Sequence, residues 1–333
     1  MLNFALFGAG RIGKMHAQNI QASTNACLKY VYDVYPVAAQ EVAQKTGAKV
    51  ADTIEMALQD ASVDAVLIAT STDTHVELII RAAKAGKAIL CEKPIDLDTD
   101  RVNYCLQQMQ DCPVPIQIGF NRRFDPSHGA VAQAVRDGQL GELEQLIITS
   151  RDPGMAPVEY LKTSGGIFRD MVIHDFDMAR FILAEEIVEL QAFGSALVDP
   201  EISTIGDVDS VMLIMKTASG KLVHINGSRR AVYGYDQRVE AFGSQGMVLS
   251  NNQTPTSVTH FSQTATSVQA PLYNFFIDRY EQAYRDQLTA FIDNVSQGKP
   301  VSPSFEDGRR AQMLADAAQQ SLESGQAVTL QWD

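Results

Sequence analysis

A short apolar segment runs directly into three spaced glycines near the start of the chain, in the stretch NFALFGAGRIG. A strand that stops at G-x-G-x-x-G and continues as a helix is the dinucleotide-binding fingerprint, with backbone left bare for a pyrophosphate. The unpaired N–H groups at the start of that helix form an anion site. A purely structural glycine turn is the alternative, which the flanking strand and helix disfavour. The predicted phosphate contacts are Gly8, Gly10, Arg11, Ile12 and Gly13.

A carboxylate follows the second predicted strand, Leu28–Tyr32, at Asp33. An acid about 20 residues beyond the glycines, at the end of that strand, accepts a hydrogen bond from the ribose 2′-hydroxyl. The same charge repels the 2′-phosphate of NADP, and Val34-Tyr35-Pro36 supplies no Arg or Lys to offset the repulsion. NAD is therefore the favoured cofactor, although Arg11 leaves NADP open.

Strands and helices alternate over the next hundred residues. Apolar runs predict strands at 64–70, 87–91 and 114–119, and amphipathic patterns predict helices at 37–46, 75–85 and 98–109. This alternation indicates a doubly wound parallel sheet over residues 1–120, whose ligands bind beyond the carboxyl ends of the strands. The residues expected there are Thr70, Ser71, Thr72, His75, Glu92, Lys93 and Asn121. For His75, capping and packing of its own helix is the alternative role.

The pattern changes from about residue 121. Longer alternating segments at 144–150, 188–196, 210–215, 221–228 and 238–241 predict a large open, mostly antiparallel sheet. Helices are expected over 279–295 and 306–324, and a solvated loop or edge strand over 250–267. Residues 121–333 are thus predicted to form a second α/β domain that binds substrate and mediates oligomerisation.

Composition excludes several classes of protein. A length of 333 residues suits two domains that each bury a core, and 45% hydrophobic residues is usual for a globular protein. A net charge of -13 argues against nucleic-acid or membrane-surface partners, which attract basic faces. With neither a membrane-length apolar stretch nor a signal-peptide pattern, a cytoplasmic location is expected. The four cysteines lack metal-ligand spacing and are expected to be reduced thiols.

Two groups of residues carry candidate chemistry. Lys93, in Glu92-Lys93-Pro94, follows a strand end where an ammonium could stabilise an alkoxide, with a solvated surface lysine as the alternative. Asp170 and His174 are four apart in a predicted helix, so the carboxylate can orient the imidazole and raise its basicity as a general base. A packed core histidine is one alternative. A metal site with Asp177 is another, disfavoured because hydride transfer from an alcohol needs only a base and an oxyanion stabiliser.

Several segments, read in order, carry a family resemblance: GAGRIGKMH, CEKP, GFNRRFDP, TSRDP, SGGIFRDMVIHDFDMARF and YGYDQR. Nearly the whole chain resembles the Gfo/Idh/MocA oxidoreductase family, and the last three segments resemble its subgroup acting on inositols. The resemblance implies a Rossmann domain followed by an α/β domain with a large open sheet, in dimers or tetramers. It implies Lys93, Asp170 and His174 as the catalytic residues. It also implies polyol contacts at Asn121, Arg123, Asp152, Tyr233, Tyr235, Tyr280 and Tyr284.

The activity that the resemblance implies is NAD-dependent oxidation of the axial 2-hydroxyl of myo-inositol to 2-keto-myo-inositol, in inositol catabolism. Many polar contacts suit a ring of hydroxyls, since buried polar groups discriminate strongly between analogues. The same chemistry on scyllo-inositol or glucose is a rival within the enzyme class. A non-catalytic regulator that senses NAD is the rival from another class, and the joint presence of Lys93, Asp170 and His174 disfavours it.

Overall fold

The computed structural model describes residues 1–332, and the chain forms two compact units. The first comprises residues 1–121 and 283–312, and the second comprises residues 122–282 and the chain from residue 313 on. A single boundary at residue 120 does not describe this division, because the chain returns to the first unit over residues 283–312. Among residues 1–332, no helix combines the length and apolar character needed to cross a membrane.

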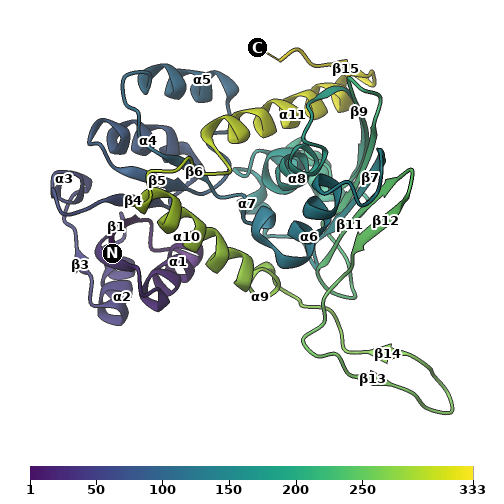
Figure 1. Cartoon of the computed structure of the whole chain (residues 1–333), viewed down its shortest axis with the longest axis horizontal. Coiled ribbons are helices and arrows are strands. Elements are labelled where there is room, and N and C mark those ends of the chain that lie inside the picture. Colours follow the sequence, from purple (N-terminus) through teal and green to yellow (C-terminus); the bar gives the residue numbers. More distant parts are fainter. Residues whose placement is uncertain (333) are drawn as a thin grey trace. The chain divides into compact units, whose positions relative to one another are not determined.

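A six-stranded parallel sheet forms the centre of the first unit (Figure 1). Its strand order is β3-β2-β1-β4-β5-β6. Every residue of β4 and β5 is buried, as expected for a parallel sheet with both faces covered. The predicted Rossmann-type sheet is confirmed. The strands are β1 (Leu2–Phe7), β2 (Ala26–Tyr32), β3 (Lys49–Val50), β4 (Ala65–Ile68), β5 (Ala88–Cys91) and β6 (Ile116–Ile118).

Helices from both ends of the chain complete the core of the first unit. The Phe291 ring of α10 lies 5.9 Å, centroid to centroid, from the Phe4 ring of β1, and Leu288 and Ile292 join the same apolar cluster. The C-terminal return therefore contributes to the core under the dinucleotide fingerprint. The helices are α1 (Arg11–Ala22), α2 (Pro36–Thr46), α3 (Ile54–Leu58), α4 (His75–Lys84), α5 (Thr99–Gln108), α10 (Glu281–Ser296) and the start of α11 (Phe305–Ser324).

The second unit is built on a seven-stranded sheet in the order β12-β11-β7-β10-β9-β8-β15. Only the β10–β7 pair is parallel among the strand pairs described there, so the predicted mostly antiparallel sheet is confirmed. The strands are β7 (Leu143–Arg151), β8 (Ile187–Ser195), β9 (Ser210–Thr217), β10 (Leu222–Ser228), β11 (Asp236–Gly243), β12 (Gly246–Ser250) and β15 (Val328–Thr329).

One face of this sheet packs against α6 (Pro126–Arg136) and α8 (Ile173–Leu183) (Figure 1). Helix α6 was not among the predicted helices, although Asp125 and Pro126 are a usual helix start. The Asp125 carboxylate caps the N–H groups of Ser127 and His128 at 3.0 Å each. The expected helix 279–295 is interrupted at Tyr280, between α9 (Phe276–Arg279) and α10.

The other face of the sheet is open. In β9 the side chains of Val211, Leu213 and Met215 are buried, whereas those of Met212 and Ile214 between them are exposed. Within residues 250–267, where a loop or edge strand was expected, β13 (Thr259–His260) pairs with β14 (Val268–Gln269). This hairpin extends away from the sheet of the second unit (Figure 1).

Candidate active site

The glycine turn has the shape that a dinucleotide requires. Gly8 has a φ of +93°, and a Cβ there would collide with the carbonyl oxygen of Ala69. A Cβ on Gly13 would collide with the carbonyl oxygen of Gly8, so helix and strand approach too closely for any side chain. At Gly10 a Cβ would meet no atom of residues 1–332 within 4 Å. The loop therefore combines two packed glycines with one that faces open space at a helix N-terminus, as a bound pyrophosphate needs.

Asp33 lies beside this turn. Its Oδ2 accepts a hydrogen bond of 2.6 Å from the N–H of Ala9, and its Oδ1 accepts one of 2.8 Å from the N–H of Tyr35. The fold thus brings together the two parts of the predicted fingerprint, 24 residues apart in the chain. The carboxylate also helps to fix the turn that would hold the phosphates.

Glu92 is held by a histidine that the sequence analysis left without a role. His16 Nε2 lies 2.7 Å from Glu92 Oε1, and both side chains are largely buried. Gly119 leaves the room for Glu92, since a Cβ at Gly119 would lie 2.7 Å from Oε2. The signal in the sequence was the spacing Ile12, His16, Ile20, which places the imidazole on the buried face of α1.

His75 also contacts the turn that contains Glu92 and Pro94. Its Nδ1 lies 2.8 Å from the carbonyl oxygen of Pro94, and its Nε2 lies 3.2 Å from that of Thr70. The imidazole is 1% exposed, and burial lowers its pKa. Its observed role is to tie the loop after β4 to the turn after β5, while a direct contact with the cofactor stays a prediction. Lys93, half-buried, lies between the two residues that the histidines hold.

Two further predicted contacts belong to the first unit. Asn121 is 2% exposed, and its Nδ2 has no hydrogen-bond partner among residues 1–332. A buried donor without a partner is costly, so a ligand acceptor would satisfy it. Tyr284 has its ring edge-on to the His16 ring, with the centroids 5.7 Å apart.

In the second unit, Asp170 and His174 lie one turn apart on a continuous helical run. Phe168–Val172 is a π-helical turn that passes into α8, where the sequence predicted a plain α-helix; such turns are frequent at functional sites. Tyr160 donates a hydrogen bond of 2.9 Å from its hydroxyl to Asp170 Oδ1, and Arg229 donates one of 3.0 Å from Nη1 to Oδ2. Tyr160 and Arg229 were not among the predicted site residues.

Asp152 follows β7 and is half-buried. Burial raises the pKa of its carboxyl to about 6, against the opposing effects of Arg229 and then Arg122, with Asp170 adding to the rise. The second unit therefore holds a carboxyl whose pKa is raised toward neutral pH and which is influenced by the charge of Asp170.

Tyr235 and Tyr280, predicted from different parts of the sequence, come together. Their rings are edge-on with centroids 6.0 Å apart, and Arg122 Nη2 donates to the Tyr235 hydroxyl at 3.4 Å. Burial raises the pKa of Tyr280 to about 12, so its phenol stays protonated. The hydroxyl of Tyr233 donates to Asp236 Oδ2 at 2.6 Å.

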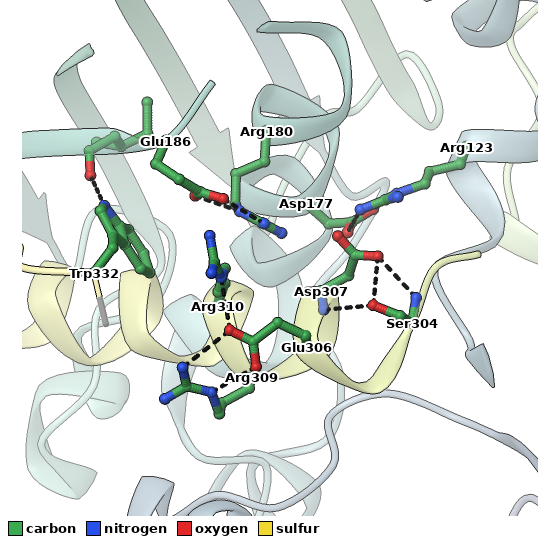
Figure 2. Close-up of polar contacts among 11 residues, drawn as sticks. Arg123, Asp177, Arg180, Glu186, Ser304, Glu306, Asp307, Arg309, Arg310 and Trp332 are labelled. Atoms are coloured by element: carbon green, nitrogen blue, oxygen red, sulfur yellow. Dashed lines mark hydrogen bonds and ion pairs between the residues drawn. The ribbon is translucent and has the colours of Figure 1, made fainter. Parts of the chain in front are cut away.

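Arg123 is engaged in a salt bridge rather than grouped with these tyrosines. Its Nε and Nη2 donate to the two oxygens of Asp177 at 2.8 and 2.6 Å, a buried bidentate pair (Figure 2). Its neighbour Arg122 is the arginine beside Tyr235, and a polyol contact of Arg123 stays a prediction. The same salt bridge occupies Asp177, which had been considered as a metal ligand. Residues 1–332 contain no group of three His, Cys, Asp or Glu side chains arranged to hold a metal.

Comparisons with known proteins cover both units. Residues 2–120 match the family model described as "Oxidoreductase family, NAD-binding Rossmann fold", and residues 128–249 match the one described as "GFO/IDH/MocA C-terminal domain". Inositol 2-dehydrogenase of Rhizobium meliloti is 49% identical over 99% of both chains.

Solved structures agree with this similarity. A myo-inositol dehydrogenase from Corynebacterium glutamicum has 43% sequence identity and a TM-score of 0.97, with 100% of both chains covered. A scyllo-inositol dehydrogenase from Lactobacillus casei, solved with bound NAD(H) and scyllo-inositol, has 28% identity and a TM-score of 0.91 over 99% of both chains.

Proposed function

Because the chain belongs to the Gfo/Idh/MocA oxidoreductase family, we propose that it is an NAD-dependent dehydrogenase that oxidises the 2-hydroxyl of myo-inositol to the ketone, 2-keto-myo-inositol. The observation that carries this proposal is the similarity to an inositol 2-dehydrogenase over 99% of both chains.

The residues present fit NAD, which when bound accepts the hydride from the substrate carbon. Gly8, Gly10 and Gly13 shape the phosphate turn, and Asp33 lies where a ribose hydroxyl can donate to it. The backbone of Arg11 and Ile12 supplies N–H donors. We assign further cofactor contacts to Thr70, Ser71, Thr72, His75, Glu92, Lys93 and Asn121.

The chain's own residues handle the proton. We assign His174 as the general base that takes the proton of the 2-hydroxyl, with Asp170 orienting the imidazole and stabilising its charged form. We assign Lys93 as the cation that stabilises the alkoxide developing on the same oxygen. Each role exploits a charge that is needed more in the transition state than in the ground state, which is how such groups raise kcat.

For the substrate we propose contacts at Asn121, Asp152, Tyr235 and Tyr280, and we keep Arg123, Tyr233 and Tyr284 as further candidates. A polyol offers hydroxyls that donate to Asp152 and accept from tyrosine hydroxyls, and each unmatched buried group penalises a wrong stereoisomer. The second candidate substrate is scyllo-inositol, favoured by the similarity to a scyllo-inositol dehydrogenase.

We also propose a homo-oligomer, a dimer or tetramer, in which a second copy covers the open sheet face. Phe193, Met212 and Ile214 are exposed there at 59%, 60% and 53%, an apolar surface that monomers seldom leave in water. Light scattering of Met212→Glu/Ile214→Glu tests it, because a dissociated variant supports the interface and an unchanged mass opposes it. A reducing, cytoplasmic location suits the four free thiols.

The test of the function is a spectrophotometric screen of NAD reduction against inositol stereoisomers, glucose and other polyols. The proposal expects the highest kcat/KM with myo-inositol. A higher value with scyllo-inositol would select the second candidate. Bound NAD with no reduction by any polyol would favour a regulator.

A further inference from the structure

Arg229 is the largest fully buried side chain of the second unit and lies among carboxylates. Its side chain is 2% exposed; Nη1 donates to Asp170 Oδ2 at 3.0 Å, and Nη2 lies 3.7 Å from Asp207 Oδ2. Its backbone N–H donates to the carbonyl oxygen of Asp209 at 2.8 Å. A guanidinium this far from water is stable only with carboxylate partners. The contacts with Asp170 and Asp207 therefore fix the side chain, and the backbone hydrogen bond to Asp209 fixes the main chain.

The two oxygens of Asp170 are engaged by different donors. Tyr160 binds Oδ1 and Arg229 binds Oδ2, so the plane of the carboxylate cannot rotate without losing one of them. Asp207 is fixed in turn, since its Oδ1 accepts a hydrogen bond of 3.0 Å from the N–H of Ile167, just before the π-helical turn that carries Asp170.

The guanidinium of Arg229 also acts on Asp152. After burial, it is the largest influence on the pKa of the Asp152 carboxyl and the main one that favours its charged form. The buried guanidinium of Arg229 therefore acts on two carboxylates. Asp152 is a proposed substrate contact, and Asp170 is the partner of the proposed base.

We propose that Arg229 is a positioning residue, which together with Tyr160 holds Asp170 ionised and oriented for His174. The inference rests on the proposed function for the catalytic role of Asp170. Orienting partners matter because a small misplacement of a catalytic group costs up to roughly 100-fold in rate.

The test compares Arg229→Gln and Arg229→Lys, with Arg180→Gln as the matched control. Arg180 forms a bidentate pair with a different carboxylate of the same unit, Glu186, at 2.8 and 2.7 Å (Figure 2). Arg229→Gln should lower kcat by roughly 10- to 100-fold. Loss of the positive charge should also stabilise the imidazolium, so the acid limb of the kcat/KM profile should move up by about 1 pH unit. Arg229→Lys keeps the charge and should retain the wild-type limb with a partly reduced kcat.

If Arg229 had only a structural role, Arg229→Gln would lower kcat or Tm but keep the wild-type pH profile. That result would overturn the proposal. Tyr160→Phe, at a side chain that is 51% exposed, should fold normally and move the limb in the same direction by less. If the acid limb of Tyr160→Phe stays at the wild-type pH, Tyr160 does not hold Asp170 together with Arg229.

An NMR titration separates this inference from the proposed function, because it needs no turnover. The imidazole resonances of His174, assigned with His174→Gln, should titrate at higher pH in Arg229→Gln than in the wild type, with the charges of Asp152, Asp170 and Asp207 still present. An inactive wild type with this shift would reject the proposed function and keep the positioning. An unshifted titration would reject the positioning.

Discussion

The Nε2 atom of His16 lies 2.7 Å from Oε1 of Glu92, between side chains that are 1% and 14% exposed. His16 is on the helix that starts at the glycine turn, and Glu92 directly precedes Lys93. The helix that would bind the phosphates therefore also fixes the turn that carries the proposed catalytic lysine.

His16→Phe keeps an aromatic ring against Tyr284 but leaves Glu92 without this partner. A buried acceptor that loses its hydrogen-bond partner costs about 1–3 kcal/mol, so the free energy of unfolding should fall by at least about 1 kcal/mol. The loosened turn should lower kcat about tenfold with a smaller effect on the Kd of NAD. Chemical denaturation, steady-state kinetics and NADH fluorescence titration measure the three quantities. His260→Gln, on the exposed hairpin, is the control, and a His16→Phe enzyme with the kcat of that control would show that the contact does not serve Lys93.

Asp33→Ser combined with Val34→Arg should shift preference from NAD toward NADP. The change removes an acceptor and a repulsive charge, and Val34, 74% exposed, has room for the new guanidinium. The ratio of kcat/KM for the two cofactors should change by about 1–3 kcal/mol per charged contact. Asp33→Asn is the control, because it can still accept from Ala9. A cofactor ratio that stays at the wild-type value in the double variant would place the ribose elsewhere.

Asp152→Asn should stabilise the protein above pH 6. The pKa of this carboxyl rises from its ordinary value of 3.8 to about 6 in the folded state, chiefly through burial. Ionisation therefore favours the unfolded chain as pH rises from about 4 to 6, and the cost is complete above 6. Asparagine does not ionise and avoids this cost, so the free energy of unfolding of Asp152→Asn at pH 7.5 should exceed that of the wild type by roughly 1–3 kcal/mol. The gain should vanish near pH 4. Denaturant titrations of both proteins at the two pH values measure it, and a variant less stable than wild type at pH 7.5 would contradict the assignment.

Asp170 and His174 should behave as one unit. His174→Ala should lose 10²- to 10⁴-fold in kcat near neutral pH, the usual value of a positioned base. Asp170→Asn should lose less and move the acid limb of kcat/KM down in pH, opposite to the effect expected for Arg229→Gln, because the charge removed here is negative. The double variant should be little worse than His174→Ala alone. Kinetics across pH on all three variants test the coupling, and strictly additive losses would return His174 to the role of a packed histidine.

Local spacing and topology made part of this site predictable. The glycine turn and Asp33 follow a fixed spacing, and the ends of parallel strands meet at one edge of a sheet, so their proximity could be read from the chain. Alternating polarity likewise predicted the open sheet of the second unit.

Contacts between distant segments could not be predicted in this way. Arg229 lies 59 residues from Asp170, and His16 lies 76 residues from Glu92. No periodicity connects such pairs. The choice between Arg122 and Arg123 depends on the 3-10 turn Asn121–Phe124, which sends adjacent side chains to different partners. The π-helical turn at Phe168–Val172 has no sequence pattern of its own.

The most direct measurement uses myo-inositol deuterated at C2 with unlabelled NAD. Mass spectrometry of the reduced cofactor then shows where the hydride came from. The proposed reaction predicts one deuterium per NADH formed, with 2-keto-myo-inositol as the product. Unlabelled NADH, or no NADH from myo-inositol at all, would contradict oxidation at the 2-position.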